Sequence, residues 1–302
     1  MTNTVFTGNT KMSRTRSHTS LKTLKGEFFS SKTGVIYHGD CLELLPFIRS
    51  ESIDCVFADP PFNLRKRYGP RTPDNSSDEQ YLHWCKLWIS ECVRSLKPGG
   101  AFFFYHIPKW AIRLGSLIEN RGLVFRHWIA ISMKNNYPRG NGLYPAHYAL
   151  LYFTKGKPRV FNKLRTPIPV CRHCGKEIKD YGGHRSKLKE GGLNLSDFWN
   201  DTSPVRHRKF KKREANELNP MIPERAILIS TKPRDIVFDP FGGGGSSYVV
   251  AEKNHRFWIG SEIEDCSPIL ERLEEQTGVI FSQIPQKQII KIFGKMGTFL
   301  NK

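Results

Sequence analysis

An α/β fold with a doubly wound, mostly parallel sheet is the fold class that this sequence predicts. Short apolar segments of strand length alternate with helix-like segments along most of the chain, which is typical of parallel strands connected by covering helices. The alternation stops between residues 156 and 216, where proline, glycine and basic residues predominate. A chain of 302 residues is long enough to bury one full α/β core and to carry a smaller inserted region.

The first part of the alternation precedes the inserted region. Residues 34–40 and 52–58 are apolar runs of strand length, and a helical stripe of apolar residues separates them. Residues 63–78 are rich in Gly, Pro and Arg, and we expect a mobile loop there. The remaining elements expected before residue 156 are a helix at 78–96 that ends at Lys97-Pro98-Gly99-Gly100, a strand at 101–105, a helix at 109–121, and strands at 123–133 and 146–153.

Regular structure is expected to resume after residue 216. A helix at 220–231 opens on Asn219-Pro220 and ends before Lys232-Pro233, because proline fits the first turn of a helix but not its interior. The elements expected after it are a strand at 235–239, a helix at 246–253, a strand at 256–262 and a helix at 267–276.

The net charge of +19 is concentrated in two segments. Residues 1–32 hold six basic residues and one acidic residue, a net charge of +5, and residues 134–213 hold nineteen basic and five acidic residues, a net charge of +14. Clustered Lys and Arg indicate a polyanionic partner, because they release condensed counterions when they neutralise phosphates. Nucleic acid is therefore favoured over a merely solvated surface.

Composition also bears on the compartment. No apolar run approaches the roughly 20 residues that a membrane-spanning helix needs. Seven cysteines, an odd number, follow no secretory apolar segment, which indicates free thiols in a reducing compartment. We therefore expect a cytoplasmic, nucleoid-associated protein without a membrane partner. The basic N-terminal segment is expected to be a disordered tail rather than an organelle transit peptide.

An Asp-Pro-Pro-Phe segment directly follows the predicted strand at 52–58. Its two prolines exclude a helix or a further strand, so the chain leaves the sheet as a stiff extended loop. An exocyclic amine on a nucleobase is a poor nucleophile, because its lone pair is delocalised into the ring. Asp59 offers a carboxylate, and Pro60 a carbonyl fixed by Pro61, to accept the two N–H bonds. Phe62 offers a ring that can stack on an extruded base.

Four consecutive glycines follow the predicted strand that ends at Asp239. Glycine allows positive φ and close approach of a ligand to the backbone, at the strand end where α/β sheets bind ligands. The run departs from Gly-x-Gly-x-x-Gly, so no pyrophosphate is implied. Glu262 ends the next predicted strand, where a carboxylate can accept hydrogen bonds from both hydroxyls of a ribose. A place beside a helix N-terminus is the alternative role for Glu262.

Together these motifs resemble the S-adenosylmethionine-dependent DNA amino-methyltransferases, and in particular their beta group, in which Asp-Pro-Pro-Phe precedes the cofactor loop. The resemblance extends from about Gly34 to Leu270 and implies a seven-stranded, Rossmann-like methyltransferase sheet. It implies that Asp40 and Cys41 contact the adenine end of the cofactor and that Glu262 contacts the ribose. The residues that it places around the methionine part are Asp239, Pro240, Phe241, Gly242 and Gly244.

The sequence departs from the family pattern at two places. Asn219-Pro220 stands where the family usually has a His-Pro-Thr-type segment, so no individual contact is assigned there. The four glycines replace the more usual Gly-Ser-Gly-Thr-Thr, which keeps small residues throughout. With these motifs placed, the expected segments are a disordered basic tail at 1–33, a catalytic half at 34–155, an inserted target-recognition region at 156–216, a cofactor-binding half at 217–280, and a C-terminal tail at 281–302.

The resemblance implies methylation of the exocyclic N6 of adenine in duplex DNA after base flipping. Adenine is favoured because the catalytic loop begins with Asp; cytosine N4 is the alternative. An RNA-base methyltransferase and an inactive DNA-binding protein are less favoured, because the cofactor loop comes second and both motifs are intact. A restriction-modification system with a separately acting endonuclease is expected, and the protein would be a monomer or a homodimer.

Residues 134–216 occupy the position of the family's target-recognition region. Phosphate contacts would position the protein there, and contacts to base edges would specify the sequence. The DNA-binding candidates are Asn135, Arg139, Arg206, Arg208 and Lys211, with Asn136, Asn141 and His207 as further candidates.

Cys171 and Cys174 have the spacing of a zinc knuckle. A complete site needs four ligands, and the nearby candidates are His173, His184 and His207. Half a site is a weak signal, so two free thiols in a turn are the favoured interpretation. His106 and His147 follow or precede apolar strands, and core or rim positions are favoured for both over a catalytic role.

Overall fold

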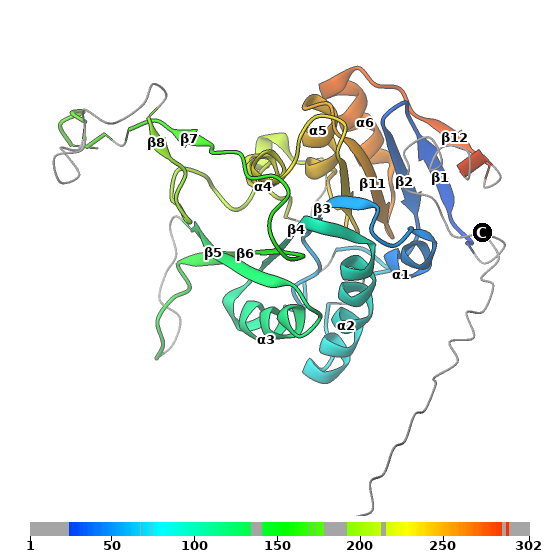
Figure 1. Cartoon of the computed structure of the whole chain (residues 1–302), viewed down its shortest axis with the longest axis horizontal. Helices are drawn as coiled ribbons and strands as arrows, with labels where there is room; N and C mark the ends of the chain where they lie inside the picture. The colour runs from blue at the N-terminus through cyan, green and yellow to red at the C-terminus, as the bar shows by residue number, and fades with distance from the viewer. Residues whose placement is uncertain are drawn as a thin grey trace, which may run out of the picture.

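The computed structural model describes residues 24–66, 68–72, 74–133, 141–168, 170–171, 173–177, 192–212, 216–285 and 288–289. Within these residues, a ten-stranded mixed sheet forms the centre of the molecule (Figure 1). Its strands are, in spatial order, β12 (Ser282–Ile284), β1 (Glu27–Ser30), β2 (Gly34–His38), β11 (Phe257–Glu262), β10 (Ile236–Asp239), β3 (Ile53–Ala58), β4 (Leu96–His106), β6 (His147–Thr154), β5 (Val124–Ser132) and β9 (Phe198–Trp199).

The seven strands from β2 to β5 in this order correspond to the seven strands that the sequence predicts. β2, β11, β10, β3 and β4 are parallel neighbours, whereas β6 runs antiparallel to both β4 and β5. The prediction of a doubly wound, mostly parallel sheet is confirmed, and three short strands extend it at its edges. Because the five parallel strands all end at the same edge, the loops that follow them lie together.

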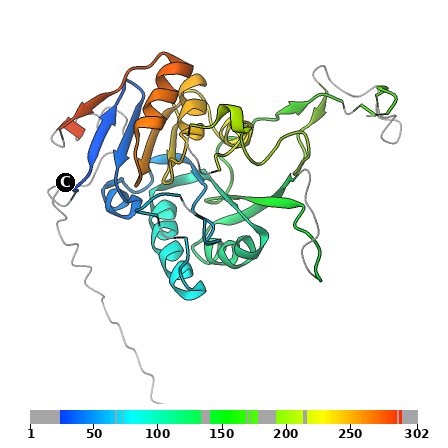
Figure 2. The ribbon, with the colours of Figure 1, turned by 180° about the vertical axis from the view of Figure 1, so that it is seen from behind.

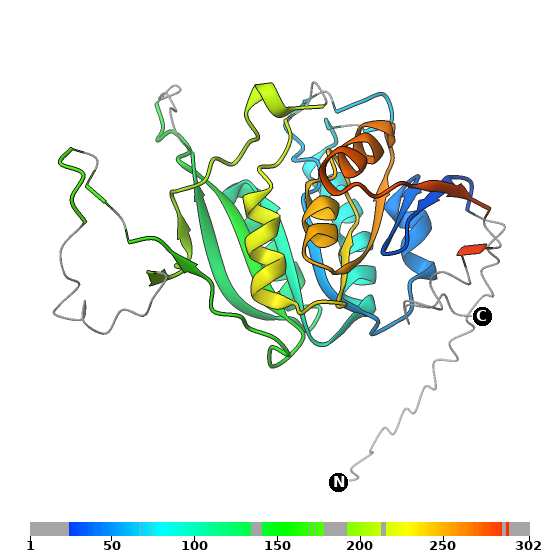
Figure 3. The same cartoon turned by 90° about the horizontal axis from the view of Figure 1, so that it is seen from above.

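Helices cover both faces of this sheet (Figure 3). Alternate residues of β3 explain why: Val56 and Ala58 pack into one hydrophobic cluster, and Cys55 and Phe57 pack into the other. The helices on the Val56 face are α1 (Cys41–Leu44), α2 (Asp78–Ser95) and α3 (Pro108–Glu119). The helices on the Phe57 face are α4 (Met221–Ser230), α5 (Ser246–Lys253) and α6 (Ser267–Thr277).

Parts of the two predicted tails belong to the sheet. β1 pairs with β2 and with β12, although the sequence places residues 27–30 in an N-terminal tail and residues 282–284 in a C-terminal one. Phe28 is buried and its ring lies 4.7 Å from that of Tyr37. Such short segments become strands only by adding to an existing sheet edge, and local sequence does not show that edge. Residues 1–23 lie outside the described residues.

β4 begins five residues earlier than predicted. Leu96 pairs with Ile53 and Ala101 with Cys55, so the Lys97-Pro98-Gly99-Gly100 segment is taken up as an irregularity within the ladder. The helix that precedes it ends at Ser95, as the Pro-Gly-Gly signal predicts. The signal therefore marks the end of the helix correctly, but not the start of the strand.

The inserted region contains little regular structure in its described part. β7 (Arg165–Thr166) and β8 (Leu193–Asn194) form a separate two-stranded sheet on an extension that projects away from the main sheet (Figure 2). The chain then returns to the body, where β9 joins the sheet edge beside β5 and the side chain of Trp199 is buried. A 3-10 turn, η4 (Arg208–Phe210), precedes α4. Among the described helices, none combines the length and the apolar character needed to cross a bilayer.

Candidate active site

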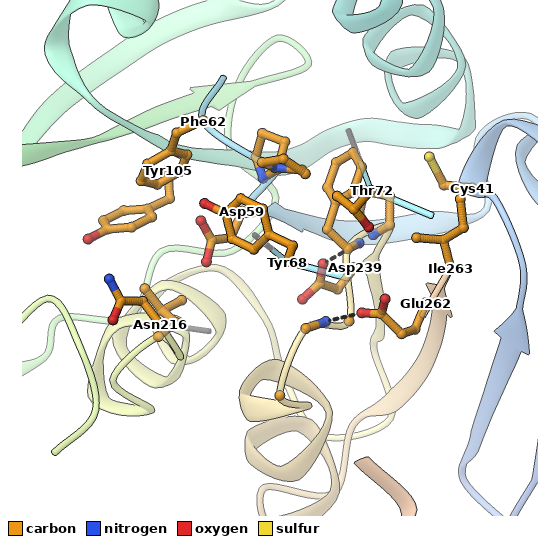
Figure 4. Close-up of a pocket in the computed structure, with 18 of the residues that line it drawn as sticks. Cys41, Asp59, Phe62, Tyr68, Thr72, Tyr105, Asn216, Asp239, Glu262 and Ile263 are labelled. Atoms are coloured by element: carbon orange, nitrogen blue, oxygen red, sulfur yellow. Dashed lines mark hydrogen bonds between the residues drawn. The ribbon is translucent and has the colours of Figure 1, made fainter. Parts of the chain in front are cut away.

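A cavity of about 470 Å³ lies at the edge of the sheet where the parallel strands end. The segments that follow four of these strands line it (Figure 4). They are Gly39–Cys41 after β2, Asp59–Phe62 after β3, Asp239–Gly244 after β10, and Glu262 at the end of β11. The Asp-Pro-Pro-Phe segment and the glycine loop are 180 residues apart in the sequence, and they meet here because β3 and β10 are neighbours in the sheet.

Asp239 organises the glycine loop from within. Its carboxylate accepts hydrogen bonds from the Phe241 N–H, at 2.9 Å, and from the Ser247 hydroxyl. Burial raises the pKa of Asp239 to about 7, although these two hydrogen bonds oppose the increase. The side chain predicted to contact a cofactor therefore also fixes the backbone that would surround one.

Glu262 lines the cavity beside this loop. Its Oε2 atom accepts a hydrogen bond from the Gly243 N–H at 2.6 Å, and its Oε1 atom accepts one from the Glu264 N–H at 2.8 Å. The carboxylate thus links the glycine loop to the end of β11. Asp40 caps α1 through a 2.9 Å hydrogen bond from the Leu42 N–H and lines the cavity together with Cys41.

The glycine loop has no room for larger side chains. Gly245 has a φ of +73° directly before α5, a conformation that favours glycine. A Cβ atom on Gly244 would lie 2.5 Å from the Arg272 guanidinium and 2.9 Å from the Glu217 carboxyl carbon. Packing within the protein therefore requires small residues here, in addition to any requirement of a ligand.

A buried ion pair supports the loop from below. Arg272 and Glu217 are joined at 2.7 Å, each with 1% of its side chain exposed, and Arg272 also donates to the Gly244 carbonyl. Arg206 adds a second cation: its Nη2 donates to the Ser246 Oγ at 3.0 Å, and its Nε lies 3.4 Å from Glu217. Predicted as a DNA contact, Arg206 is instead largely buried against the cofactor half of the site. Sequence alone does not show this pairing, since Glu217 and Arg272 come from distant segments.

Asp59 is half-buried and faces the cavity (Figure 4). Within the described part of the chain, its carboxylate accepts no hydrogen bond, and neither does the carbonyl of Pro60. The carbonyl of Pro61, in contrast, accepts one from the Tyr81 hydroxyl at 2.5 Å. Burial and the nearby Asp239 raise the pKa of Asp59 well above its ordinary value, while Lys66 opposes the shift. Asp59 and Pro60 both line the cavity, and these two acceptors have no hydrogen-bond partner among the described residues.

Aromatic rings surround Asp59. Burial, together with the Asp59 carboxylate, raises the pKa of Tyr105 and of Tyr148, whose rings stack at 5.4 Å. Tyr68 and Trp84 line the same cavity. Tyr105 ends a predicted strand and Tyr148 starts one, but only the pairing of β4 with β6 shows that both face one cavity. No local feature of the sequence marks these two tyrosines as site residues.

Phe62 is more enclosed than predicted. It is 7% exposed, and its ring stacks on that of His106 at 4.5 Å, so one ring face is already covered. His106 is fully buried, which agrees with the core position that the sequence favoured. Only the part of Phe62 that lines the cavity remains available for stacking on a base.

A buried carboxylate holds the loop that follows Phe62. Asp74 accepts hydrogen bonds from the N–H groups of Asn63, Leu64 and Lys66 at 2.6, 2.9 and 2.8 Å. The loop was expected to be mobile, but its described residues are tied together by this one side chain, which the sequence analysis did not single out. Further along, the backbone N–H of Arg71 and the hydroxyl of Thr72 donate to Glu264, so the loop covers the end of β11.

Of the remaining DNA-binding candidates, some are described by the structure and others are not. Lys211 donates to the side chain of Asn216, which lines the cavity. Asn135, Asn136 and Arg139 lie outside the described residues, as does the side chain of Arg208.

The Cys171–Cys174 pair forms a tight turn. The Gly175 N–H donates to the Cys171 carbonyl at 2.9 Å, and backbone N–H groups of Cys174 and His173 lower the pKa of the Cys171 thiol. Among the residues that the structure describes, no group of three or more His, Cys, Asp or Glu side chains gathers as a metal site would require. His184 lies outside the described residues.

Comparison with known proteins places these features in one family. The N6_N4_Mtase family model, described as DNA methylase, matches residues 53–267. The chain is 48% identical over 250 residues to the type II methyltransferase M.BamHI of Bacillus amyloliquefaciens, which covers 82% of this chain and 59% of the relative. It is 32% identical over 248 residues to M.BglII of Bacillus subtilis, covering 76% of this chain and 65% of the relative. The chain thus spans less than two thirds of both relatives.

Solved structures show the same fold. The PvuII DNA methyltransferase, described as cytosine-N4-specific, superposes with a TM-score of 0.58 at 20% identity, over 88% of this chain and 93% of that one. The M1.HpyAVI–SAM complex superposes with a TM-score of 0.53 at 19% identity, over 80% and 97%. With its family match extending from β3 to the start of α6, and with both motifs on one cavity, the chain belongs to the N6_N4 family of DNA methylases.

Proposed function

We propose that this chain transfers a methyl group from S-adenosylmethionine to an exocyclic amine of a base in duplex DNA. The observation that carries this proposal is that one cavity contains hydrogen-bond acceptors for an amine as well as a glycine loop suited to a cofactor. Asp59 and Pro60 present hydrogen-bond acceptors without described partners, and the glycine loop with Glu262 forms a cradle beside them. A nucleophilic amine and a methyl donor would meet between these two sets of groups.

The residues present fit the cofactor. A cavity of about 470 Å³ is within the usual range for a small-molecule site, about 300–1,000 Å³. Glu262 would accept the ribose hydroxyls, Asp40 and Cys41 would border the adenine, and Phe241 would lie near the sulfonium. When bound, the cofactor supplies an electrophilic methyl group. The rings of Phe241 and Trp84, whose centroids lie 5.5 Å apart, would exclude water from part of this space.

The Asp59 loop would prepare the amine. Its carboxylate and the Pro60 carbonyl would each accept one N–H of the target amine, which localises the nitrogen lone pair and points it at the methyl group. The C–N bond then forms as the C–S bond breaks, and the amine proton passes to Asp59 or to water. Much of the acceleration would come from this alignment. The aromatic rings of Tyr68 and Tyr148 would border the extruded base.

Duplex DNA is the proposed substrate because of where the basic segment lies. The segment with a net charge of +14 includes residues that line the cavity, among them Pro204 and Val205. Phosphates of a duplex would therefore be held next to the site that receives the flipped base. By the type II names of its relatives, the activity is proposed to protect DNA in a restriction-modification system.

The identity of the base is a finer part of the proposal. The leading Asp59 favours adenine N6, and cytosine N4 is the alternative. Nucleoside mass analysis of duplex DNA after incubation with the protein and S-adenosylmethionine separates the two, and sequencing of DNA from expressing cells with base-modification detection gives the target site. Competition by structured RNA tests the preference for a duplex.

Substitution of Asp59 tests the catalytic role. Asp59→Ala is expected to abolish methyl transfer while cofactor and DNA binding persist, because the amine loses its carboxylate acceptor. The matched control is Asp78→Asn, an acid on the surface of α2 paired with Lys109 and Arg113, which should leave the rate unchanged. Undiminished methylation by Asp59→Ala would refute the assigned role.

A further inference from the structure

Two side chains outside the recognised motifs hold the Asp59–Phe62 loop. Tyr81, on the first turns of α2, donates its hydroxyl to the Pro61 carbonyl at 2.5 Å. The same hydroxyl lies 2.7 Å from Nε2 of His106, the last residue of β4. Tyr81 and His106 are 5% and 0% exposed, and Tyr81 and Pro61 also border the cavity. A line of hydrogen bonds thus runs from β4 through α2 to the loop.

The direction of this line is set by the backbone. The Ile107 N–H donates to Nδ1 of His106 at 2.8 Å, so Nδ1 carries no proton. The proton of the neutral ring is therefore on Nε2, which donates to the Tyr81 oxygen, and Tyr81 in turn donates to Pro61. Burial lowers the pKa of His106 well below its ordinary value, which keeps the ring in this neutral form. The three hydrogen bonds therefore all run in one direction, from the Ile107 N–H through His106 and Tyr81 to the Pro61 carbonyl.

The two proline carbonyls of the loop differ in their hydrogen bonding. Pro61 has its carbonyl occupied by Tyr81, whereas that of Pro60 accepts no hydrogen bond from a described residue. Because both residues are prolines with fixed φ, holding one carbonyl also limits the orientation of the peptide before it. The Phe62 ring, stacked on His106, adds a second point of attachment to the same histidine. The loop is therefore held at both of the residues that follow Pro60.

We propose that Tyr81 and His106 are positioning residues that aim the Pro60 carbonyl and the Asp59 carboxylate at the target amine. The inference rests on the proposed amine methylation, because only a reaction at this loop would report its alignment. His106 is fully buried, and the hydroxyl of Tyr81, which borders the cavity, is engaged by Pro61 and His106, so both side chains would act on the loop. Their effect would be on the chemical step, since a small displacement of acceptors from the reacting nitrogen costs rate and leaves cofactor binding intact.

Replacement of the Tyr81 hydroxyl is the direct test. Tyr81→Phe is expected to lower the single-turnover rate of methyl transfer about tenfold or more, at saturating DNA and cofactor. The dissociation constant for S-adenosylmethionine should stay within about twofold of the wild-type value. The matched control is Tyr152→Phe, which also removes one buried hydroxyl, in this case one without a hydrogen-bond partner among the described residues and away from the loop. Its rate should match the wild type.

Variants of His106 separate positioning from folding. His106→Gln retains an N–H donor near the Nε2 position and should recover most of the rate, whereas His106→Leu should fall to the rate of Tyr81→Phe. A Tyr81→Phe rate equal to that of Tyr152→Phe would overturn the inference. So would a loss shared equally by His106→Gln and His106→Leu. A wild-type protein that binds cofactor but methylates no DNA would instead overturn the proposed function, on which the inference depends.

Discussion

At the scale of single residues, some carboxylates of the site hold its backbone through hydrogen bonds, and another has no described donor and can accept hydrogen bonds from a substrate. Asp239 and Glu262 accept hydrogen bonds from the glycine loop, whereas Asp59 has no described donor. Asp59 and Glu262 were predicted as site residues from their positions at or just after strand ends, and Asp239 from the resemblance to the family. The sequence did not predict Tyr81, His106 or Asp74, because nothing local shows which loop a tyrosine, a histidine or an aspartate will contact. Their contacts depend on the packing of α2 and β4 around the loop.

The raised pKa of Asp59 gives a stability prediction with a definite sign. A carboxyl group whose folded pKa exceeds its unfolded pKa favours the folded state below the unfolded pKa, and this contribution is lost as the pH rises through the folded pKa. Asp59→Asn should therefore raise Tm at pH 8 by a few degrees, roughly 2–4 °C. The increase should disappear near pH 3. Thermal unfolding across this pH range measures the effect.

Asp78, the control position, has a pKa shift of the opposite sign to that of Asp59. Hydrogen bonds from Lys109 and Arg113 lower the pKa of Asp78, so its contribution is present above the unfolded pKa and is lost as the pH falls. Asp78→Asn should leave Tm unchanged or slightly lower at pH 8, since the group is exposed. A lower Tm for Asp59→Asn at pH 8 would show that the carboxylate at position 59 is not a buried, uncompensated charge.

At the scale of elements, the strength of a local pattern decides what the sequence predicts. The seven central strands were predicted because each is an apolar run bounded by turn residues. β1, β12 and β9 have four, three and two residues and exist only through pairing with a neighbour already in place. The loop predicted at 63–78 behaves similarly: its polar composition suggested mobility, yet the buried Asp74 accepts hydrogen bonds from three of its N–H groups. Polar composition does not reveal an acceptor inside the fold.

Asp74→Ala should release this loop. Three backbone donors would lose their buried acceptor, so the free energy of unfolding should fall by about 1–3 kcal/mol, with the loop re-solvating part of the loss. Hydrogen exchange at the amides of Asn63, Leu64 and Lys66 should become faster, and cofactor binding should weaken because the loop lines the cavity. The control is Glu274→Ala, an exposed acid of α6. Unchanged protection at all three amides would contradict the assigned role of Asp74.

At the scale of the whole molecule, the sheet brings together segments that are remote in the chain. β3 lies between β10 and β4, so the acceptor loop and the glycine loop become neighbours although the inserted region separates them in sequence. That inserted region holds most of the excess positive charge and borders the cavity. The charge was predictable from composition, but the burial of Arg206 was not, because Glu217 and Arg272 join it only in the folded chain.

Binding of duplex DNA should therefore depend steeply on salt, and cofactor binding should not. Lys209→Ala, at an exposed position of η4 in the basic segment, should reduce the slope of log Kobs against log salt concentration by about 0.9, which corresponds to one phosphate contact. Lys253→Ala is the matched control, since it removes the same charge at the end of α5, on the opposite edge of the sheet. Titrations from low to high salt give both slopes. Equal slopes for the two variants would show that Lys209 contacts no phosphate.

The position of β7 and β8 on a projecting extension has one further consequence. The chain passes through this region on its way from β6 to α4 and β10, but the parts before and after it are held together by the pairing of β10 with β3 and of β11 with β2, and by the packing of α4 on β3. Cleavage of the backbone after Lys176 would therefore leave two fragments that remain associated. Supplied as separate polypeptides, the same two pieces should reassemble into one particle, so covalent continuity through the extension is dispensable for forming the cavity.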